Sequence, residues 1–150
     1  MDLAYLLTRW RNIRAGLIQT IDKFQADELD FRPYLTSRSV RQIMLHIAHE
    51  EYGEFAHGIA QTLNEFPTEY DPEGYSSKED VKALLESVHK QTLDYLRELN
   101  DSDLSRVINT PWGATYRLVE MIDHIIEHEV HHRAELSLIL GILGREGFNA

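Results

Sequence analysis

Apolar residues recur every three or four positions along most of the chain, which is the periodicity of amphipathic α-helices. In residues 3–25 this apolar row consists of Leu6, Trp10, Ile13, Leu17, Ile21 and Phe24. The same periodicity predicts three further helices, over about residues 40–63, from the segment SSKEDV to about residue 99, and over about residues 118–143. No stretch shows a convincing strand alternation, so no strands are predicted.

Polar residues and glycines mark where these helices begin and end. Ser39 and Gln42 have the spacing of a capping box at the start of the second helix. Ser76 and Glu79 have the same spacing at the start of the third. Gly144, just after the last apolar positions, fits the end of the fourth helix. Four long helices joined by connections of about 12 to 18 residues predict an all-α four-helix bundle.

Composition restricts the environment and the partners. The 150 residues, 43% of them hydrophobic and 27% charged, suit one folded domain over residues 1–150. A net charge of −10 without a basic stripe predicts no nucleic-acid partner. The longest apolar run, LSLILGIL, is far below the roughly 20 residues of a membrane span, and no signal peptide is evident, so we expect a cytoplasmic protein with no membrane partner. Since there is no cysteine, His, Asp or Glu must hold any metal.

The segment HIIEHEVHHRAEL contains four histidines that differ in the direction they face. On a helical wheel, His132 points towards the core and His128 lies at the core edge one turn away, whereas His124 and His131 flank them. A single histidine at a core edge is usually structural. Two at this four-residue spacing can converge on one ion, so the pair His128 and His132 predicts a metal site.

A third ligand has to come from another helix. The second helix offers His46 and His57, which lie on one line about 16 Å apart, so only one can reach the pair. Periodicity does not choose between them, because this helix is apolar around most of its circumference. His89 in the third helix is interpreted as a solvated surface residue without a role.

Two familiar motifs fit the sequence incompletely. His128, Glu129 and His132 match the H-E-x-x-H pattern of zinc proteases, but the further ligands that such enzymes need are missing downstream. Glu-x-x-His also occurs at residues 54–57 and 129–132, as in di-iron bundles. That site needs a Glu from each of the other two helices, and the first helix has none. Both interpretations are therefore disfavoured.

The run SVRQIMLHIAHEE and the later HIIEHEVHHRAEL, together with LDFRP and TPWG, resemble the DinB/YfiT-like superfamily of bacterial metalloproteins over nearly the whole chain. The resemblance implies an up-down-down-up four-helix bundle in which His46, His128 and His132 hold a divalent metal. It thereby selects His46 rather than His57. Glu135 stands where relatives often carry Gln, and a carboxylate there could orient a histidine, bind an amine or act as a base.

Three neutral histidines leave a metal position open, as in catalytic sites. The resemblance implies a metal-dependent transferase that activates a low-molecular-weight thiol of the bacillithiol type for attack on a small electrophile. Zinc, nickel and iron all suit imidazole ligands. Glu50, His131 and Glu135 are candidates for the surrounding cleft. The alternative is a non-catalytic bundle, stabilised by a metal or free of one, that binds a partner. The uncovered apolar residues of LSLILGIL further predict a homodimer.

Overall fold

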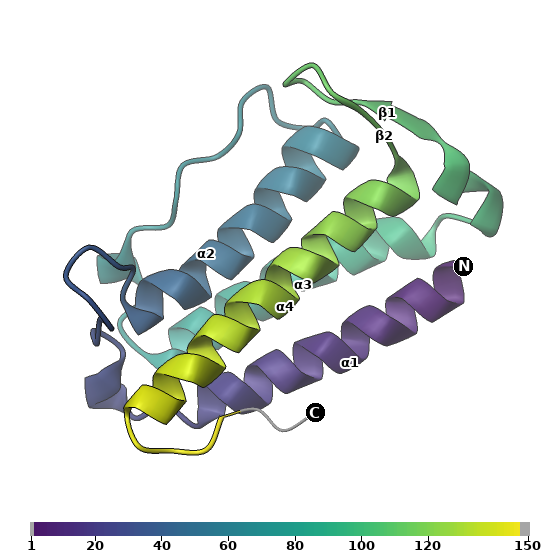
Figure 1. The fold of residues 1–150 in the computed structure, drawn as a ribbon. Coiled ribbons are helices and arrows are strands. Elements are labelled where there is room, and N and C mark those ends of the chain that lie inside the picture. Colours follow the sequence, from purple (N-terminus) through teal and green to yellow (C-terminus); the bar gives the residue numbers. More distant parts are fainter. Residues whose placement is uncertain (1, 148–150) are drawn as a thin grey trace.

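The computed structural model describes residues 2–147 and contains four long helices (Figure 1). These are α1 (Leu3–Asp22), α2 (Val40–Gly53), α3 (Lys78–Arg97) and α4 (Leu118–Ile142). Each predicted helix is present, and the starts of the first, second and fourth agree with the sequence pattern. The predicted all-α four-helix bundle is confirmed.

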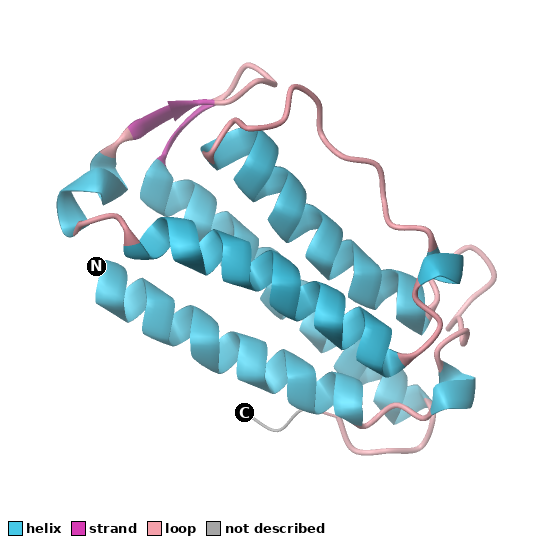
Figure 2. Ribbon diagram, turned by 180° about the vertical axis from the view of Figure 1, so that it is seen from behind, coloured by secondary structure: helices cyan, strands magenta, loops and turns pink. Residues whose placement is uncertain are grey.

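The four helices follow an up-down-down-up order. Helix α2 packs against α3 and α4, while α1 packs against α4 and, with a smaller contact, against α3. The helices α2 and α3 run in the same direction, so the chain between them has to return along the whole bundle. Figures 1 and 2 both show this connection, residues 60–77, passing beside α2. A long loop is thereby laid over one helix of the bundle.

Apolar side chains of all four helices fill the space between them. The buried residues form two clusters, one including Leu17, Ile43 and Leu85, the other including Leu6 and Trp10. Trp10 and Leu17 are completely buried, as the apolar row of the first helix predicts. The bundle therefore holds its helices at fixed positions by burial of apolar surface.

The second helix ends earlier than predicted and in a different geometry. Beyond Gly53 the chain continues as a π-helix, Glu54–Ile59, closed by a bond from the Ala60 amide to the Phe55 carbonyl at 2.8 Å. Gln61 then adopts a left-handed conformation with φ of 52°, which stops the helix. The second helix was predicted to continue to about residue 63, but the helical segment ends at Ile59. The apolar pattern does not reveal the change from α-helical to π-helical hydrogen bonds.

The capping boxes agree in one case and differ in the other. Ser39 and Gln42 cap α2 reciprocally, as predicted. At α3 the caps are Ser77 and Asp80, one residue later than the predicted Ser76 and Glu79. The carbonyl of Ser76 instead accepts a hydrogen bond from the Arg41 guanidinium at 2.5 Å. Ser76 and Ser77 each have an acidic residue three positions later, so the sequence allows either serine to cap the helix. The contact of Ser76 with Arg41 accompanies capping by Ser77.

A short hairpin precedes α4 and contradicts the prediction of no strands. Its strands β1 (Val107–Asn109) and β2 (Thr115–Arg117) pair antiparallel, with Ile108 opposite Tyr116. Three residues per strand are too few to show an alternating pattern. The hairpin covers the end of the bundle where α2 ends and α4 begins (Figure 1). No helix within residues 2–147 is long and apolar enough to cross a membrane.

Candidate metal centre

Three histidines from two helices converge between α2 and α4. His46 comes from the middle of α2, and His128 and His132 come from successive turns of α4. One ring nitrogen of each lies within 4.8 Å of those of the other two. The ring centroid of His46 lies 5.1 Å from that of His128 and 4.9 Å from that of His132. The residues that the sequence analysis singled out as ligands are thus brought together.

Carboxylates on the outer side of two rings determine which nitrogen is free. Nδ1 of His132 lies 2.7 Å from Oε2 of Glu135, and Nδ1 of His46 lies 3.0 Å from Oε1 of Glu69. Because a carboxylate only accepts, each Nδ1 carries the proton and donates it. In both rings Nε2 is then left with a free lone pair, the form in which an imidazole binds a metal.

The inner nitrogens have the spacing of donors around one ion. Nε2 of His132 lies 3.1 Å from Nε2 of His128. Two donors at about 2.1 Å from one zinc-like ion are separated by slightly more than 3 Å when the angle between them is near tetrahedral. The donor set of three imidazoles therefore fits a divalent transition-metal ion.

Burial keeps these rings neutral. It lowers the pKa of His128 to about 3, and the neighbouring His132 and His46 contribute further. Burial likewise lowers the pKa of His46 and of His132 below the ordinary histidine value. At neutral pH the three rings therefore do not have to lose a proton before they can bind a cation.

A second group of possible ligands adjoins the first within residues 2–147. It consists of His46, His49 and Glu50. Nε2 of His49 donates to the Pro67 carbonyl at 2.8 Å, which leaves Nδ1 as an acceptor, 3.3 Å from Oε1 of Glu50. Glu50, predicted from the sequence to lie in the cleft, is therefore beside His46, whereas Glu69, Pro67 and His49 were not identified. Pro67 and Glu69 lie on the long loop, whose path the helical pattern does not reveal.

The other histidines lie around this centre. His131 is exposed, and its ring centroid lies 4.8 Å from that of His132. His124 contacts Glu54 at 3.4 Å, one turn away. His57 is buried, pairs with the Leu63 carbonyl and stacks on Trp112. It belongs to neither ligand group among the described residues.

His89 is not the solvated residue that was predicted. Only 8% exposed, it pairs through Nδ1 with Glu51 at 2.9 Å. Arg14 bridges Glu51 and Glu129 at 2.5 and 2.8 Å, and Glu129 also accepts from the Trp10 indole. Arg14 lies at helical spacing between Trp10 and Leu17 on the buried row of α1, a signal that could have predicted its burial. The Glu of the protease-like motif thus belongs to a buried ion-pair cluster.

The sequence profile of the DinB superfamily matches residues 9–136. The chain belongs to this superfamily. A Bacillus subtilis relative, the protein YizA, is 32% identical over 66 residues, which is 43% of this chain and 42% of the relative. The match therefore spans less than half of either chain.

Solved structures, one of them of a DinB-like protein, share the fold. A DinB-like protein from Bacillus cereus superposes with a TM-score of 0.80 at 14% identity, over 99% of this chain and 97% of that one. YfiT from Bacillus subtilis, described as a probable metal-dependent hydrolase with an unusual four-helix bundle topology, gives 0.73 at 20% identity, over 96% and 89%. A mycothiol-dependent maleylpyruvate isomerase gives 0.64 at 15% identity, over 88% of this chain and 60% of the isomerase.

Proposed function

We propose that this DinB-superfamily protein is a metal-dependent enzyme in which His46, His128 and His132 hold a divalent transition-metal ion. The observation that carries the proposal is the orientation of the rings. Carboxylates fix the Nδ1 protons of His46 and His132, and the Nε2 atoms of His128 and His132 face each other at 3.1 Å. Nε2 of His132 is an acceptor at this distance, and a neutral His128 can also offer its Nε2 lone pair, so both nitrogens could bind one cation.

The reaction that we propose is transfer of a low-molecular-weight thiol, of the bacillithiol type, to a small electrophile. Three imidazole ligands are typical of catalytic sites, and a divalent ion held by these histidines would supply the positive charge that stabilises a thiolate or hydroxide. Glu50 and His131 are titratable side chains near the ligands, in addition to Glu69 and Glu135, and we assign to Glu50 the uptake of the proton of the nucleophile. The fold shared with a mycothiol-dependent isomerase supports a thiol substrate.

Metal content tests the centre itself. Protein purified without a histidine tag is expected to contain about one equivalent of a transition metal, and His128→Ala should lose most of it. His124→Ala is the matched control, because this histidine lies one turn away and is 61% exposed at its side chain. Fewer than about 0.2 equivalents in the parent protein, unchanged in His128→Ala, would exclude the site.

Hydrolysis is the second candidate, because the structural neighbour YfiT is described as a probable metal-dependent hydrolase. Consumption of bacillithiol, glutathione or coenzyme A with a reactive electrophile separates the two reactions. Metal-dependent loss of thiol supports transfer. Metal-dependent loss of an ester or amide substrate without thiol supports hydrolysis.

The alternative to an enzyme is a non-catalytic bundle that binds a partner. There His46→Ala would lower the melting temperature through loss of the bound ion, and no metal-dependent rate would be found with any thiol or hydrolysable substrate. A rate that disappears in His46→Ala while the folded fraction stays high contradicts this alternative.

A further inference from the structure

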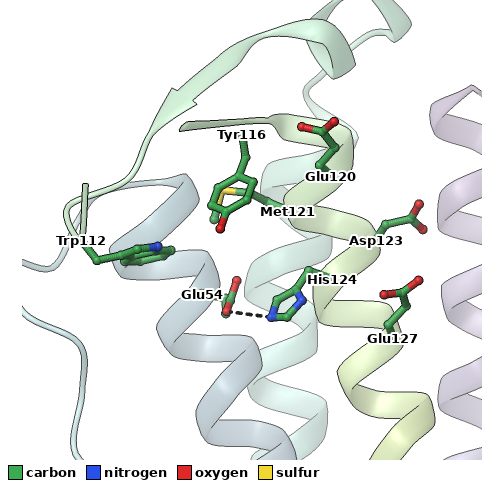
Figure 3. A pocket seen from close by; sticks show the side chains of 8 residues that line it. All are labelled: Glu54, Trp112, Tyr116, Glu120, Met121, Asp123, His124 and Glu127. Carbon is green, nitrogen blue, oxygen red and sulfur yellow. Dashed lines mark ion pairs between the residues drawn. The ribbon is translucent and has the colours of Figure 1, made fainter. Parts of the chain in front are cut away.

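A cleft of about 650 Å³ opens between the π-helix, the hairpin and the first half of α4 (Figure 3). Its walls carry Glu54 from the π-helix, Trp112 and Tyr116 from the hairpin segment, and Glu120, Asp123, His124 and Glu127 from α4. The volume suits a small organic molecule. These side chains do not include the three histidines of the candidate metal centre, and the apolar pattern of the sequence did not predict that they line a cleft.

The cleft adjoins the candidate metal centre. On α4, His124 precedes the ligand His128 by four residues, about 6 Å along the axis. Glu54 of the π-helix contacts His124 of α4 at 3.4 Å (Figure 3). Further along the bundle, His46 of α2 lies beside His128 of α4. Glu50 lies one turn before Glu54 and is close to His46. None of the three ligand histidines is among the residues that line the cleft, so its occupant would lie about one helical turn from the metal centre.

Negative charge dominates the cleft wall. Of its four carboxylates, Glu120 pairs with Arg117 at 2.7 Å and Asp123 pairs with Arg9 at 2.5 Å. Glu54 has His124 as its partner, and its side chain is only 14% exposed. Glu127 has no arginine or lysine partner among the ion pairs of residues 2–147. An uncompensated charge of this kind attracts a cation and repels an anion.

Two aromatic side chains of the hairpin segment, Trp112 and Tyr116, also line the cleft. Trp112 and Tyr116 are 46% and 42% exposed, large values for aromatic side chains in a well-packed bundle. The Trp112 indole is supported by the His57 ring, with centroids 5.8 Å apart, and lies over Gly58. A Cβ at Gly58 would come within 2.8 Å of the Trp112 ring, so a glycine is needed for this ring position. The π-helix thus fixes the position of the indole ring.

We propose that this cleft binds the substrate of the enzyme through an ammonium group, so that the electrophile is an organic cation. Carboxylates balance the positive charge, and the faces of Trp112 and Tyr116 attract it through their π-electrons. This inference rests on the proposed function, since it takes the occupant of the cleft to be the electrophile of that reaction. An anionic thiol would then approach the metal from outside this cleft.

Fluorescence of Trp112 tests the inference directly. The chain has two tryptophans, and Trp10 is completely buried, so a solvent-accessible signal comes from Trp112. Choline is the probe, and 3,3-dimethylbutan-1-ol, in which carbon replaces the charged nitrogen, is the neutral control. We expect a saturable change with choline and about tenfold weaker binding of the alcohol.

Variants separate binding of choline through charge from nonspecific binding. Glu127→Gln should weaken choline binding by about three- to tenfold, whereas Glu86→Gln, an exposed residue on α3 outside the cleft, should leave it unchanged. The His128→Ala variant should still bind choline, so loss of metal and loss of the cation site are distinguishable. Equal responses to choline and the alcohol, no saturable response, or full binding by Glu127→Gln would each overturn the inference.

Discussion

At the scale of single residues, the carboxylates around the candidate centre matter as much as the histidines. Glu135 accepts a hydrogen bond from His132, and Glu69 accepts one from His46. Both rings are therefore held with the lone pair of Nε2 free to bind a metal. Their contexts differ, because Glu135 lies three residues from its histidine on the same helix, whereas Glu69 lies on the long loop. A helical contact is fixed by the backbone geometry, while the loop contact depends on loop packing.

The role of Glu135 predicts a defect in metal affinity. Glu135→Ala removes the acceptor that orients His132, and we expect metal affinity to fall by about 10- to 100-fold. Competition with a chromophoric chelator measures this. Glu86→Ala, on the exposed side of α3, is the control and should bind metal as the parent does. Unchanged affinity in Glu135→Ala would show that His132 is oriented by packing alone.

The sequence revealed those site residues that share a helix face. The four-residue spacing of His128 and His132 predicted their convergence, and resemblance to the DinB family selected His46. Periodicity could not identify Glu69, because contacts made by a loop depend on its path rather than on local spacing. Whether the three histidines bind a metal stays a prediction. Arg14 and His89 were missed because charged side chains at core positions are uncommon and only the fold supplies their partners.

At the scale of elements, the long connection between α2 and α3 takes part in the site. Phe66 of this loop packs directly on Gly53, where a Cβ would lie 2.2 Å from the phenyl ring. The residues that follow supply the Pro67 carbonyl to His49 and the Glu69 carboxylate to His46. A glycine on α2 thus permits the loop to reach two histidines of the centre.

Substitution of this glycine should disturb both the loop and the centre. In Gly53→Ala the new methyl group displaces Phe66, with an expected cost of about 1–3 kcal/mol and weaker metal binding. Thermal unfolding and chelator competition measure the two effects. Gly141→Ala is the matched control, since nothing lies within 4 Å of the corresponding Cβ on α4. It should be neutral or stabilising by about 0.5 kcal/mol. Equal behaviour of the two variants would contradict the proposed contact.

Elements with several turns were predictable, and short ones were not. Each of the four helices repeats its apolar pattern over at least 14 residues, enough for periodicity to be evident. The π-helix and the hairpin are six and three residues per segment and depend on tertiary contacts. Both line the acidic cleft, so the least predictable elements form the proposed substrate site.

At the scale of the whole molecule, exposed apolar residues near the end of α4 bear on the predicted homodimer. Leu138 and Ile142, four residues apart, are 66% and 55% exposed. If a second copy covers them, sedimentation at micromolar concentration should show a dimer, and Leu138→Glu should shift it towards monomer. Gln91→Glu, at an exposed position on α3, controls for a general effect of one added negative charge. A monomer under these conditions would contradict the prediction.

The four helices also meet in one buried polar cluster, to which each contributes a side chain. Arg14 of α1 bridges Glu51 of α2 and Glu129 of α4, and His89 of α3 pairs with Glu51. Burial opposes the charge on both carboxylates; Arg14 and His89 nevertheless hold the pKa of Glu51 below its usual range, whereas burial raises the pKa of Glu129. A different order of the helices would separate these partners, so the cluster favours the up-down-down-up arrangement over alternatives with similar apolar faces.

Removal of the central cation should therefore cost far more than removal of a surface charge. Arg14→Met removes the guanidinium that pairs with both buried carboxylates, and we expect a loss of about 3–5 kcal/mol in the free energy of unfolding. Urea denaturation followed by circular dichroism measures it. Arg11→Met, exposed on the same helix, should change stability by less than about 0.5 kcal/mol. The Arg14→Met deficit should shrink as the pH falls, because protonation of Glu51 and Glu129 removes the uncompensated charges. A pH-independent deficit would mean that packing of the Arg14 side chain, rather than its charge, stabilises the bundle.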